Sequence, residues 1–579
     1  MHIKSLFPPI PPTPDKNLYH LLFEHPEQLA LPDTYTIHID ALTGKSRTRR
    51  EFNERVRDAA TALAAPVSEG GLGLSGDKGD IVGIFSMNCM DYVTLANTLL
   101  AITTPYALIS AFSTPFELVH ALKTSKATCL FVHPSLLSKA RIAAREVGLP
   151  QERIFILEGT VEGSGTKNLE DLIATVKSRN VKRQDIRPAK KDTLAYLVFS
   201  SGTSGLPKAV MISHGNVWAM IHIQVVVMVE ERKQQRVPPS AEPSIALAFL
   251  PFYHSYGFQT FCIRGLLGLT TIVIFPRWDL KGILRSIPRF KINILFLIPS
   301  ALHQMANSAE FSNADLSSVT VVSSGAAYLP PQLAERVVKK IPQISSVSEG
   351  YGLSECTLSA LRKPSPGLYG LTPIRGSTGI LLPGLEAKIL RDDLTHCDID
   401  EPGELWLKGD NVALGYFGNE QATKDTFFEG GWLRTGDKFR VDKTGTFFFV
   451  DRAKDTLKVS GTQVSPTEIE QVLRQHPKKL VEDVCVAGVA GHGRTSDEKV
   501  PRAWVVLSQQ ARKLFKENNQ QEVLNELEDW AKKNLSSYKW LRGGLEVVDE
   551  IPKNPTGKVL RRVLQERYEI SLKKSKAHL

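Results

Sequence analysis

The strongest constraint on the fold is a series of short runs that are apolar at nearly every position, between about residues 50 and 450. The runs lie at 81–85, 128–132, 153–157, 194–199, 271–275, 292–297 and 318–322. A strand with one solvated face alternates apolar and polar residues, so continuous runs predict strands that are buried on both faces. Longer amphipathic stretches separate them. We therefore expect an α/β fold, with helices layered on mixed, largely parallel sheets.

The character of the sequence changes in the C-terminal part of the chain. The pattern predicts a strand at 446–450, a charged turn at 451–455, and a helix whose first turn carries the residues of a capped N-terminus, beginning at Ser465. Further short strands and a polar helix follow, enough for a compact domain of about 125 residues. The boundary is placed in the charged turn. We predict a large layered α/β domain at 1–453 and a small α+β domain at 454–579.

The composition excludes several classes of protein. Hydrophobic residues make up 42% and charged residues 23%, which is typical of a globular chain and not of a disordered one. The six cysteines include no pair at CxxC spacing, so we expect reduced core thiols in an intracellular protein instead of a zinc or redox site. Apolar stretches such as 265–276 are shorter than the roughly 20 residues that span a bilayer. We expect neither a membrane span nor secretion.

The net charge of +10 raises the question of a nucleic-acid partner. The densest basic run, 177–191, contains no aromatic residue, whereas a groove for single-stranded nucleic acid places stacking aromatics among its basic groups. We interpret the run as a solvated connector and expect no nucleic-acid partner.

The last three residues suggest a cellular address. The chain closes with Ala577, His578 and Leu579, which follows the small, basic, leucine pattern of the S-K-L peroxisomal signal with two substitutions. We expect recognition by the peroxisomal import receptor and a peroxisomal location. The alternative is an ordinary basic tail on a cytoplasmic protein.

One segment has the composition of a phosphate-binding loop. The apolar run 194–199 leads directly into SSGTSGLPK at 200–208. Glycines let backbone N–H groups approach an anion, hydroxyls add donors, and a lysine adds charge. Pro207 before the lysine and Ala209 after it exclude the P-loop of NTPases, and GxSxG is absent. A flexible turn is the alternative. The candidate phosphate ligands are Ser200, Ser201, Gly202, Thr203, Ser204, Gly205 and Lys208.

The segment SSGTSGLPKAV resembles the signature loop of the adenylate-forming, AMP-binding superfamily, which includes acyl-CoA synthetases, 4-coumarate–CoA ligases, luciferases and peptide-synthetase adenylation domains. Further segments resemble the family's motifs in the family's order: FLPFYHSYGF (249–258), SSGAAYL (323–329), GYGLSE (350–355), GELWLKGDNVALGY (403–416), GWLRTGD (431–437), the segment 451–468, and PTGKVLRR (555–562). Such enzymes join a carboxylic acid to AMP with loss of pyrophosphate and then pass the acyl group to a thiol.

The resemblance implies roles for residues of the large domain. The loop would hold the β- and γ-phosphates of ATP, Glu355 would bind Mg²⁺, and Ser354 would hydrogen-bond the α-phosphate. Asp437 would accept hydrogen bonds from the ribose hydroxyls, and Arg452 would donate one. The adenine and acyl slots would be lined by Gly325, Ala326, Ala327, Gly350, Tyr351 and Gly352, and the acyl pocket also by Tyr256 and Phe258.

The resemblance also implies a mobile small domain. Lys558 would reach the acyl carboxylate and the bridging phosphate oxygen, and Lys454 matches the position of a hinge. After rotation, Lys458 would face the reacting group, and Gly461 and Gln463 would line the tunnel for CoA. His254 is either a gate between the acyl slot and this tunnel or a core histidine among aromatic residues.

The chain departs from the family's pattern at Glu349, Tyr328 and Ala209. The first two would touch the acyl and adenine walls, so they bear on the choice of acid more than on the chemistry. The resemblance implies an ATP-dependent acid–thiol ligase that uses ATP, Mg²⁺ and CoA on an aromatic, phenylpropanoid-type or medium- to long-chain fatty acid. Alternatives are an enzyme that loads a separate carrier protein and a luciferase-like oxygenase.

Overall fold

The computed structural model of the chain describes residues 2–113, 115–200, 207–235, 243–326, 329–452, 457–459, 462–464, 466–490, 499–517, 520–535, 539–555 and 557–577. In this part of the chain no helix is long and apolar enough to cross a membrane. All six cysteines lie within it, and each is buried and forms no disulfide bond, as the sequence predicts for core thiols.

The first sheet of the large domain has six strands in the order β7-β6-β4-β5-β8-β9. They are β4 (Val82–Phe85), β5 (Tyr106–Ile109), β6 (Cys129–Val132), β7 (Ile154–Ile156), β8 (Leu194–Ser200) and β9 (Lys208–Ser213). Neighbouring strands are parallel except β8 and β9, which form an antiparallel hairpin. Every residue of β4, β5 and β6 is buried, which explains why these runs lack polar positions. The candidate phosphate loop connects β8 to β9.

The second sheet has nine strands in the order β16-β15-β14-β13-β12-β10-β11-β2-β3. Its members are β2 (Thr36–Asp40), β3 (Ser46–Thr48), β10 (Ser244–Ala248), β11 (Thr270–Ile274), β12 (Ile294–Leu297), β13 (Val321–Ser324), β14 (Ser348–Tyr351), β15 (Leu361–Arg362) and β16 (Ile380–Leu381). The six central strands pair in parallel, in the order β14-β13-β12-β10-β11-β2. Antiparallel strands extend the two edges: β3 beside β2, and β15 and β16 beyond β14. The strand expected at 318–322 lies slightly later in the chain, as β13.

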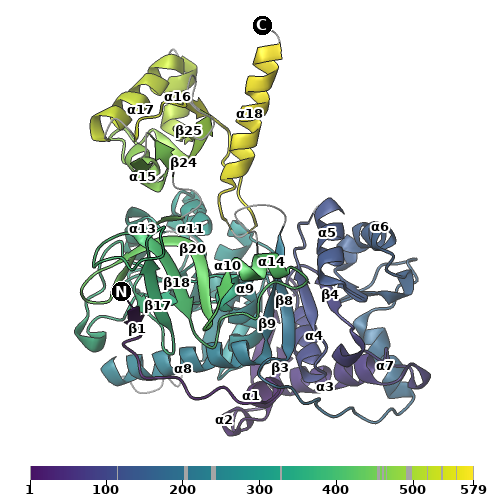
Figure 1. Cartoon of the computed structure of the whole chain (residues 1–579). Helices are drawn as coiled ribbons and strands as arrows, with labels where there is room; N and C mark the ends of the chain where they lie inside the picture. The colour runs from purple at the N-terminus through teal and green to yellow at the C-terminus, as the bar shows by residue number, and fades with distance from the viewer. Residues whose placement is uncertain are drawn as a thin grey trace.

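A third, antiparallel sheet completes the large domain. It contains β1 (His2–Lys4), β17 (Glu386–Leu390), β18 (Gly403–Lys408), β19 (Phe427–Phe428), β20 (Trp432–Val441) and β21 (Phe447–Arg452). Helices cover the sheets, including α3 (Arg49–Ala64), α4 (Met90–Ala101), α5 (Pro115–Ser125), α6 (Leu137–Val147), α7 (Leu169–Ser178), α8 (His214–Gln235), α10 (Leu280–Phe290), α11 (Pro299–Ala306) and α13 (Pro331–Lys340). Figure 1 shows α8 running along one edge of this domain, far from the small domain.

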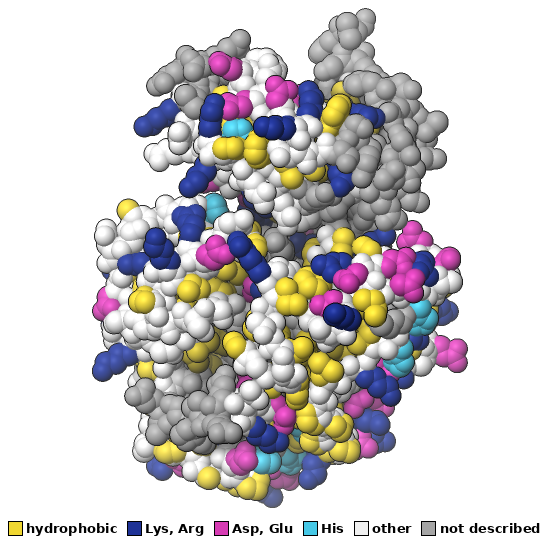
Figure 2. Space-filling model, turned by 90° about the vertical axis from the view of Figure 1, so that its left-hand side faces the viewer, with side chains coloured by type: hydrophobic (Ala, Val, Ile, Leu, Met, Phe, Trp, Pro, Cys, Tyr) yellow, Lys and Arg dark blue, Asp and Glu magenta, His cyan; other side chains and the backbone are white. Residues whose placement is uncertain are grey.

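The small domain has a core of its own. It is built on β24 (Val481–Ala490), β25 (Lys499–Leu507) and β26 (Leu545–Val547), with α15 (Pro466–Arg474), α16 (Gln509–Glu517), α17 (Gln520–Asn534) and α18 (Arg561–Ala577). It sits above the large domain in Figure 1, and Figure 2 shows a narrow waist between the two. The α/β fold with largely parallel sheets and a separate small domain is confirmed.

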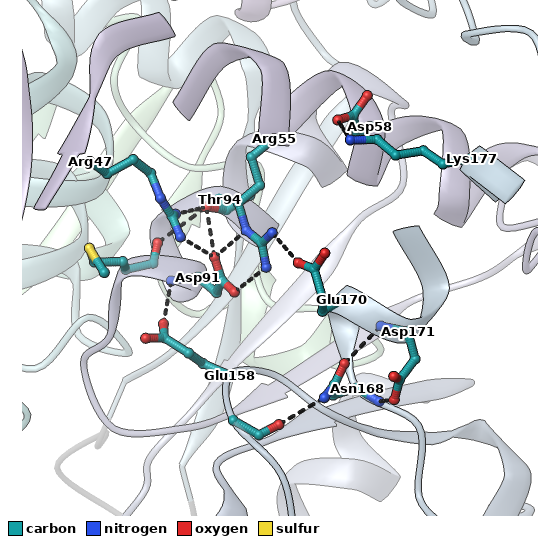
Figure 3. Close-up of polar contacts among 12 residues, drawn as sticks. Arg47, Arg55, Asp58, Asp91, Thr94, Glu158, Asn168, Glu170, Asp171 and Lys177 are labelled. Carbon is teal, nitrogen blue, oxygen red and sulfur yellow. Dashed lines mark hydrogen bonds and ion pairs between the residues drawn. The ribbon is translucent and has the colours of Figure 1, made fainter. Parts of the chain in front are cut away.

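An ion cluster centred on the buried Asp91 of α4 joins this helix to α3 and to strand β3 (Figure 3). Arg55 donates to both carboxylate oxygens of Asp91 at 2.8 and 2.7 Å, and Arg47 lies 3.0 Å from the same carboxylate. The basic connector 177–191 packs beside it, and Lys177 pairs with Asp58 of α3 at 2.5 Å. The connector is therefore held by ion pairs against α3 and is not simply solvated, because acidic residues of that helix face it.

Candidate active site

A cavity of about 960 Å³ lies where the two domains meet. It brings together the following predicted site residues: Ser200, Lys208, His254, Tyr256, Gly325, Ala326, Gly350, Tyr351, Gly352, Ser354, Glu355, Asp437 and Lys558. Residues separated by more than 350 positions in the sequence thus face one space. Such a pocket, with several convergent polar groups, is the usual form of a small-molecule site.

The parallel strands position the glycine-rich walls. Gly325 and Ala326 follow the carboxyl end of β13, and Gly350 lies at that end of β14, where open α/β sheets bind ligands. A Cβ on Gly352 would lie 1.6 Å from the carbonyl oxygen of Leu358, so only glycine fits there. A Cβ on Gly325 would lie 3.3 Å from the ring of Tyr256, so this glycine leaves a narrow slot beside an aromatic wall.

Glu355 is the centre of a polar cluster beside the candidate phosphate loop. The hydroxyls of Ser200 and Tyr416 each donate to its Oε1 at 2.8 Å. Burial and the carboxylate together raise the pKa of Tyr416. The ammonium of Lys208 lies 4.9 Å from the centroid of the Tyr416 ring. The carboxylate of Glu355 and the ammonium of Lys208 thus both lie next to Tyr416, at the two ends of the candidate phosphate loop.

The Glu355 cluster also has the chemistry of a magnesium site. No group of three or more metal-ligating side chains occurs among the described residues. Mg²⁺ usually takes one or two protein carboxylates and completes its octahedron with substrate phosphates and water. The oxygen ligands at Glu355 therefore fit a magnesium ion that arrives with a nucleotide.

Asp437 forms a second polar centre. It lies on β20, is only 6% exposed, and accepts a 2.7 Å hydrogen bond from the hydroxyl of Tyr351. Its backbone pairs with that of Arg452 on β21, so the two residues expected at the ribose are adjacent across the ladder. The structure describes only the backbone of Arg452.

A pair of serines lies between these centres and the aromatic segment. The hydroxyls of Ser354 and Ser255 are 2.8 Å apart, and both residues are buried. Ser255 is the first residue of the short helix α9 (Ser255–Gly257), so the pair joins the GYGLSE segment to the aromatic-histidine segment. The contact fixes the hydroxyl that was expected at the α-phosphate.

The small domain contributes Lys558 through a tight loop. The backbone N–H of Lys558 donates to Asn554 Oδ1 at 2.8 Å. Gly557 has φ +82°, and a Cβ on it would lie 2.7 Å from the hydroxyl of Ser300 in the large domain. Glycine thus allows the loop both its left-handed turn and its close approach. The loop carries Lys558 into the cavity.

His254 lies within the electrostatic reach of Lys558. Burial, and after it the positive charge of Lys558, lowers the pKa of His254 to about 4. The imidazole is therefore neutral at pH 7, and its Nδ1 accepts the backbone N–H of Tyr256 at 3.3 Å. His254 lines the cavity instead of lying wholly in the core.

Not every predicted site residue faces the cavity. Phe258 is fully buried, and its ring packs 4.8 Å from the Tyr196 ring and 6.0 Å from the Tyr106 ring, centroid to centroid. It does not line the acyl pocket as expected, because the helix turns its side chain toward the first sheet. The residues Ser201, Gly202, Thr203, Ser204, Gly205, Ala327, Lys454 and Gly461 lie outside the described part, and Lys458 and Gln463 are described by backbone alone, on the hairpin β22 (Leu457–Val459) and β23 (Thr462–Val464).

Three residues that were not predicted also line the cavity: Tyr416, Ser255 and Arg264. Tyr416 ends one motif-like segment and Ser255 follows His254, so position in a motif is a signal for both. Arg264 lies outside every such segment. Glu349, where the chain departs from the family's pattern, pairs its carboxylate with Lys363, and this ion pair explains the departure in part.

The chain matches known proteins over nearly its whole length. Sequence models describe residues 24–417 as AMP-binding enzyme and residues 468–558 as AMP-binding enzyme C-terminal domain. A probable 4-coumarate–CoA ligase of Dictyostelium discoideum is 31% identical, covering 96% of this chain and 95% of that protein. An acyl-CoA ligase of Alternaria alternata is 31% identical, covering 92% and 90%.

Solved structures agree on the fold. An anthranilate CoA ligase in complex with anthranoyl-AMP has a TM-score of 0.79 at 24% identity and covers 97% of this chain and 99% of its own. A benzoate CoA ligase of Burkholderia xenovorans has a TM-score of 0.76 at 22% identity, covering 95% and 99%. With its two domains, the convergent cavity and these matches, the chain belongs to the AMP-binding, adenylate-forming enzyme family.

Proposed function

We propose that the protein is an AMP-forming acid–thiol ligase, which activates a carboxylic acid with ATP as acyl-AMP and pyrophosphate and then transfers the acyl group to CoA. The observation that carries the proposal is the convergence of Lys558, Glu355 and Asp437, from two domains, on one cavity. The relatives are named as CoA ligases, which supports the same acceptor.

The first half-reaction joins two anions, so the site must offset their repulsion and align them. In the proposal, Asp437 accepts from the ribose hydroxyls while Tyr351 holds its carboxylate in place. Lys208 and the backbone of the 200–208 loop bind the β- and γ-phosphates. Glu355 would hold Mg²⁺, which supplies charge neutralisation on the phosphates. No enzyme nucleophile is required.

The reacting atoms lie near Lys558 and Ser354. Lys558 would bind the acyl carboxylate and the bridging phosphate oxygen with its ammonium. The hydroxyl of Ser354, held at 2.8 Å from that of Ser255, would donate to the α-phosphate. The neutral imidazole of His254 adds no charge beside the ammonium, which is compatible with the expected gate between the acyl slot and the tunnel for CoA.

The second half-reaction needs a different surface, because Lys558 occupies the approach to the carbonyl carbon. We propose that the small domain rotates about Lys454, a device with precedent in other enzymes. Lys458, Gly461 and Gln463 would then replace Lys558, with Gly461 leaving space for the pantetheine arm of CoA. Lys454→Pro should impair thioester formation far more than adenylation; equal losses would contradict the hinge.

Pyrophosphate exchange tests the activity directly. Purified protein with ATP, Mg²⁺ and labelled pyrophosphate should form labelled ATP only when a suitable aromatic or fatty acid is present. Product analysis with CoA should then yield acyl-CoA. Acyl-AMP that accumulates with CoA but is consumed by a carrier protein would favour a carrier-loading enzyme, and light or oxidised product in air would favour an oxygenase. If none of the acids tested supports exchange, the proposal is refuted.

We also propose peroxisomal import through Ala577, His578 and Leu579. The residues 561–577 form α18, whose C-terminal end stands away from the rest of the molecule in Figure 1, as a receptor-read terminus requires. A fluorescent reporter fused to the last dozen residues should reach peroxisomes. A diffuse cytosolic signal would contradict the proposal.

A further inference from the structure

One arginine in the cavity has no role in the chemistry described above. Arg264 begins the turn Arg264–Leu266, which follows the helical segment Phe258–Ile263. It lines the cavity together with Arg362 and Gln224. The question is what ligand group its charge serves.

The strand register places Arg264 at the end of the cavity opposite the nucleotide. Its neighbour Gly265 packs on β11, where an added Cβ would lie 2.5 Å from Ile272 Cδ1. Ile272 pairs with Ala246 of β10, which pairs with Ile294 of β12. Arg264 is therefore level with Ile294, the first residue of β12.

The end of the cavity that is expected to hold the nucleotide lies at the carboxyl ends of the same strands. Ile294 pairs with Val321, the first residue of β13, and both line the cavity. Ser324, at the carboxyl end of β13, lines it beside Gly325. Three residues of strand separate the two levels, which corresponds to roughly 10 Å at about 3.3 Å per residue.

The charge at the far end is unbalanced. Arg362 pairs with Glu231 at 3.2 Å, and Glu349 pairs with Lys363. Among the described residues, no carboxylate forms an ion pair with Arg264. Burial, and after it the repulsion of Arg362, lowers the pKa of Arg264 to about 10, so the guanidinium is still charged at pH 7. Arg264 is half-buried in the cavity wall, and a partly desolvated charge without a partner carries a cost.

The walls between the two ends are aromatic. The rings of Tyr256 and Phe296 meet edge to face with their centroids 6.5 Å apart, and both side chains line the cavity. A ligand that spans the cavity therefore crosses an apolar section between the Lys558 end and the guanidinium at the other end.

We propose that the acid activated by this enzyme is a dicarboxylic acid, whose second carboxylate binds Arg264 across an apolar spacer, with its two acidic groups roughly 10 Å apart. The inference rests on the proposed ligase function and deepens it by naming the substrate class. The second carboxylate would complete an ion pair that the protein itself leaves open.

The test compares matched acids. Pyrophosphate exchange is measured with straight-chain α,ω-dicarboxylic acids of graded length and with monocarboxylic acids of the same lengths. At the best length, the diacid should exceed its monoacid in kcat/KM by about 10- to 100-fold, the range expected for a hydrogen-bonded charge pair. Arg264→Met should abolish this preference and improve the monoacid, and Arg264→Lys should keep part of it. Arg285→Met, on the exposed face of α10, is the control and should change neither acid.

A second measurement covers the stability of the variant. Arg264→Met removes a partly desolvated charge, so its Tm should equal or exceed that of the wild type. The best diacid should raise the Tm of the wild type only. Exchange with monoacids and no diacid preference in the wild type would overturn the inference and leave the ligase function intact. A lower Tm of Arg264→Met with unchanged acid preference would also overturn it. If no acid of either series supports exchange, the proposed function itself is refuted.

Discussion

Replacement of Lys558 by Ala tests whether the small domain completes the adenylation site. Neighbouring groups cannot substitute for the lost ammonium. His254 is neutral, with a pKa of about 4, and Lys553 on the same loop pairs with Asp483 at 2.5 Å. Lys208 is held over the Tyr416 ring on the phosphate side. The loss of one preorganised charge at the reacting atoms costs about 2.7–4 kcal/mol, or a factor of roughly 10² to 10³ in rate.

The two half-reactions separate this effect from damage to the fold. Pyrophosphate exchange by Lys558→Ala should fall by the factor above, while thioester formation from supplied acyl-adenylate and CoA should stay close to wild type. Lys553→Ala is the matched control. It removes a lysine from the same loop, but this lysine binds Asp483. Equal loss in both half-reactions of Lys558→Ala would refute the reasoning.

The same variant has a readout that does not depend on activity. Lys558 is the second cause of the low pKa of His254, after burial. The pKa of His254, followed by NMR of the imidazole, should therefore rise in Lys558→Ala and stay unchanged in Lys553→Ala. An unchanged value in both would show that Lys558 does not lie near His254 in solution.

Three further predictions concern affinity and stability. Tyr351→Phe removes the hydrogen bond to Asp437 and should raise the KM for ATP by about 10-fold in pyrophosphate exchange, with a smaller effect on kcat; an unchanged KM would count against this role. Asp91→Asn leaves the buried Arg47 without its carboxylate and leaves the partly exposed Arg55 with Glu170 alone. It should lower the free energy of unfolding in urea by about 3–5 kcal/mol, whereas a loss below about 1 kcal/mol would contradict the cluster's importance. Burial lowers the pKa of His38 from its ordinary value of 6.5 to about 3. Below pH 6.5 the unfolded chain therefore binds a proton at this residue that the native protein does not bind. The contribution of His38 to stability should be complete above pH 6.5 and fall by about 2–3 kcal/mol between pH 7 and 4.5, and His38→Gln should remove this share of the pH-dependent loss.

The sequence by itself determined the layers and much of the site. The predicted runs that became β4 and β6 are almost continuously apolar because both of their faces are covered, and that pattern is local. The residues Glu355, Asp437 and Lys558 were named because the short segments that contain them resemble the motifs of the adenylate-forming family. Their convergence on one cavity follows the expectation.

Only the tertiary structure decided which side chains meet across the cavity. Phe258 stands two residues from Tyr256, yet the helix turns one ring into the core and the other toward Gly325. The partners of Asp437 and Glu355 come from distant strands and turns, which no local pattern relates. Arg264 became notable only through the register of β10, β11 and β12, because a charge is unbalanced only with respect to neighbours that the fold brings to it.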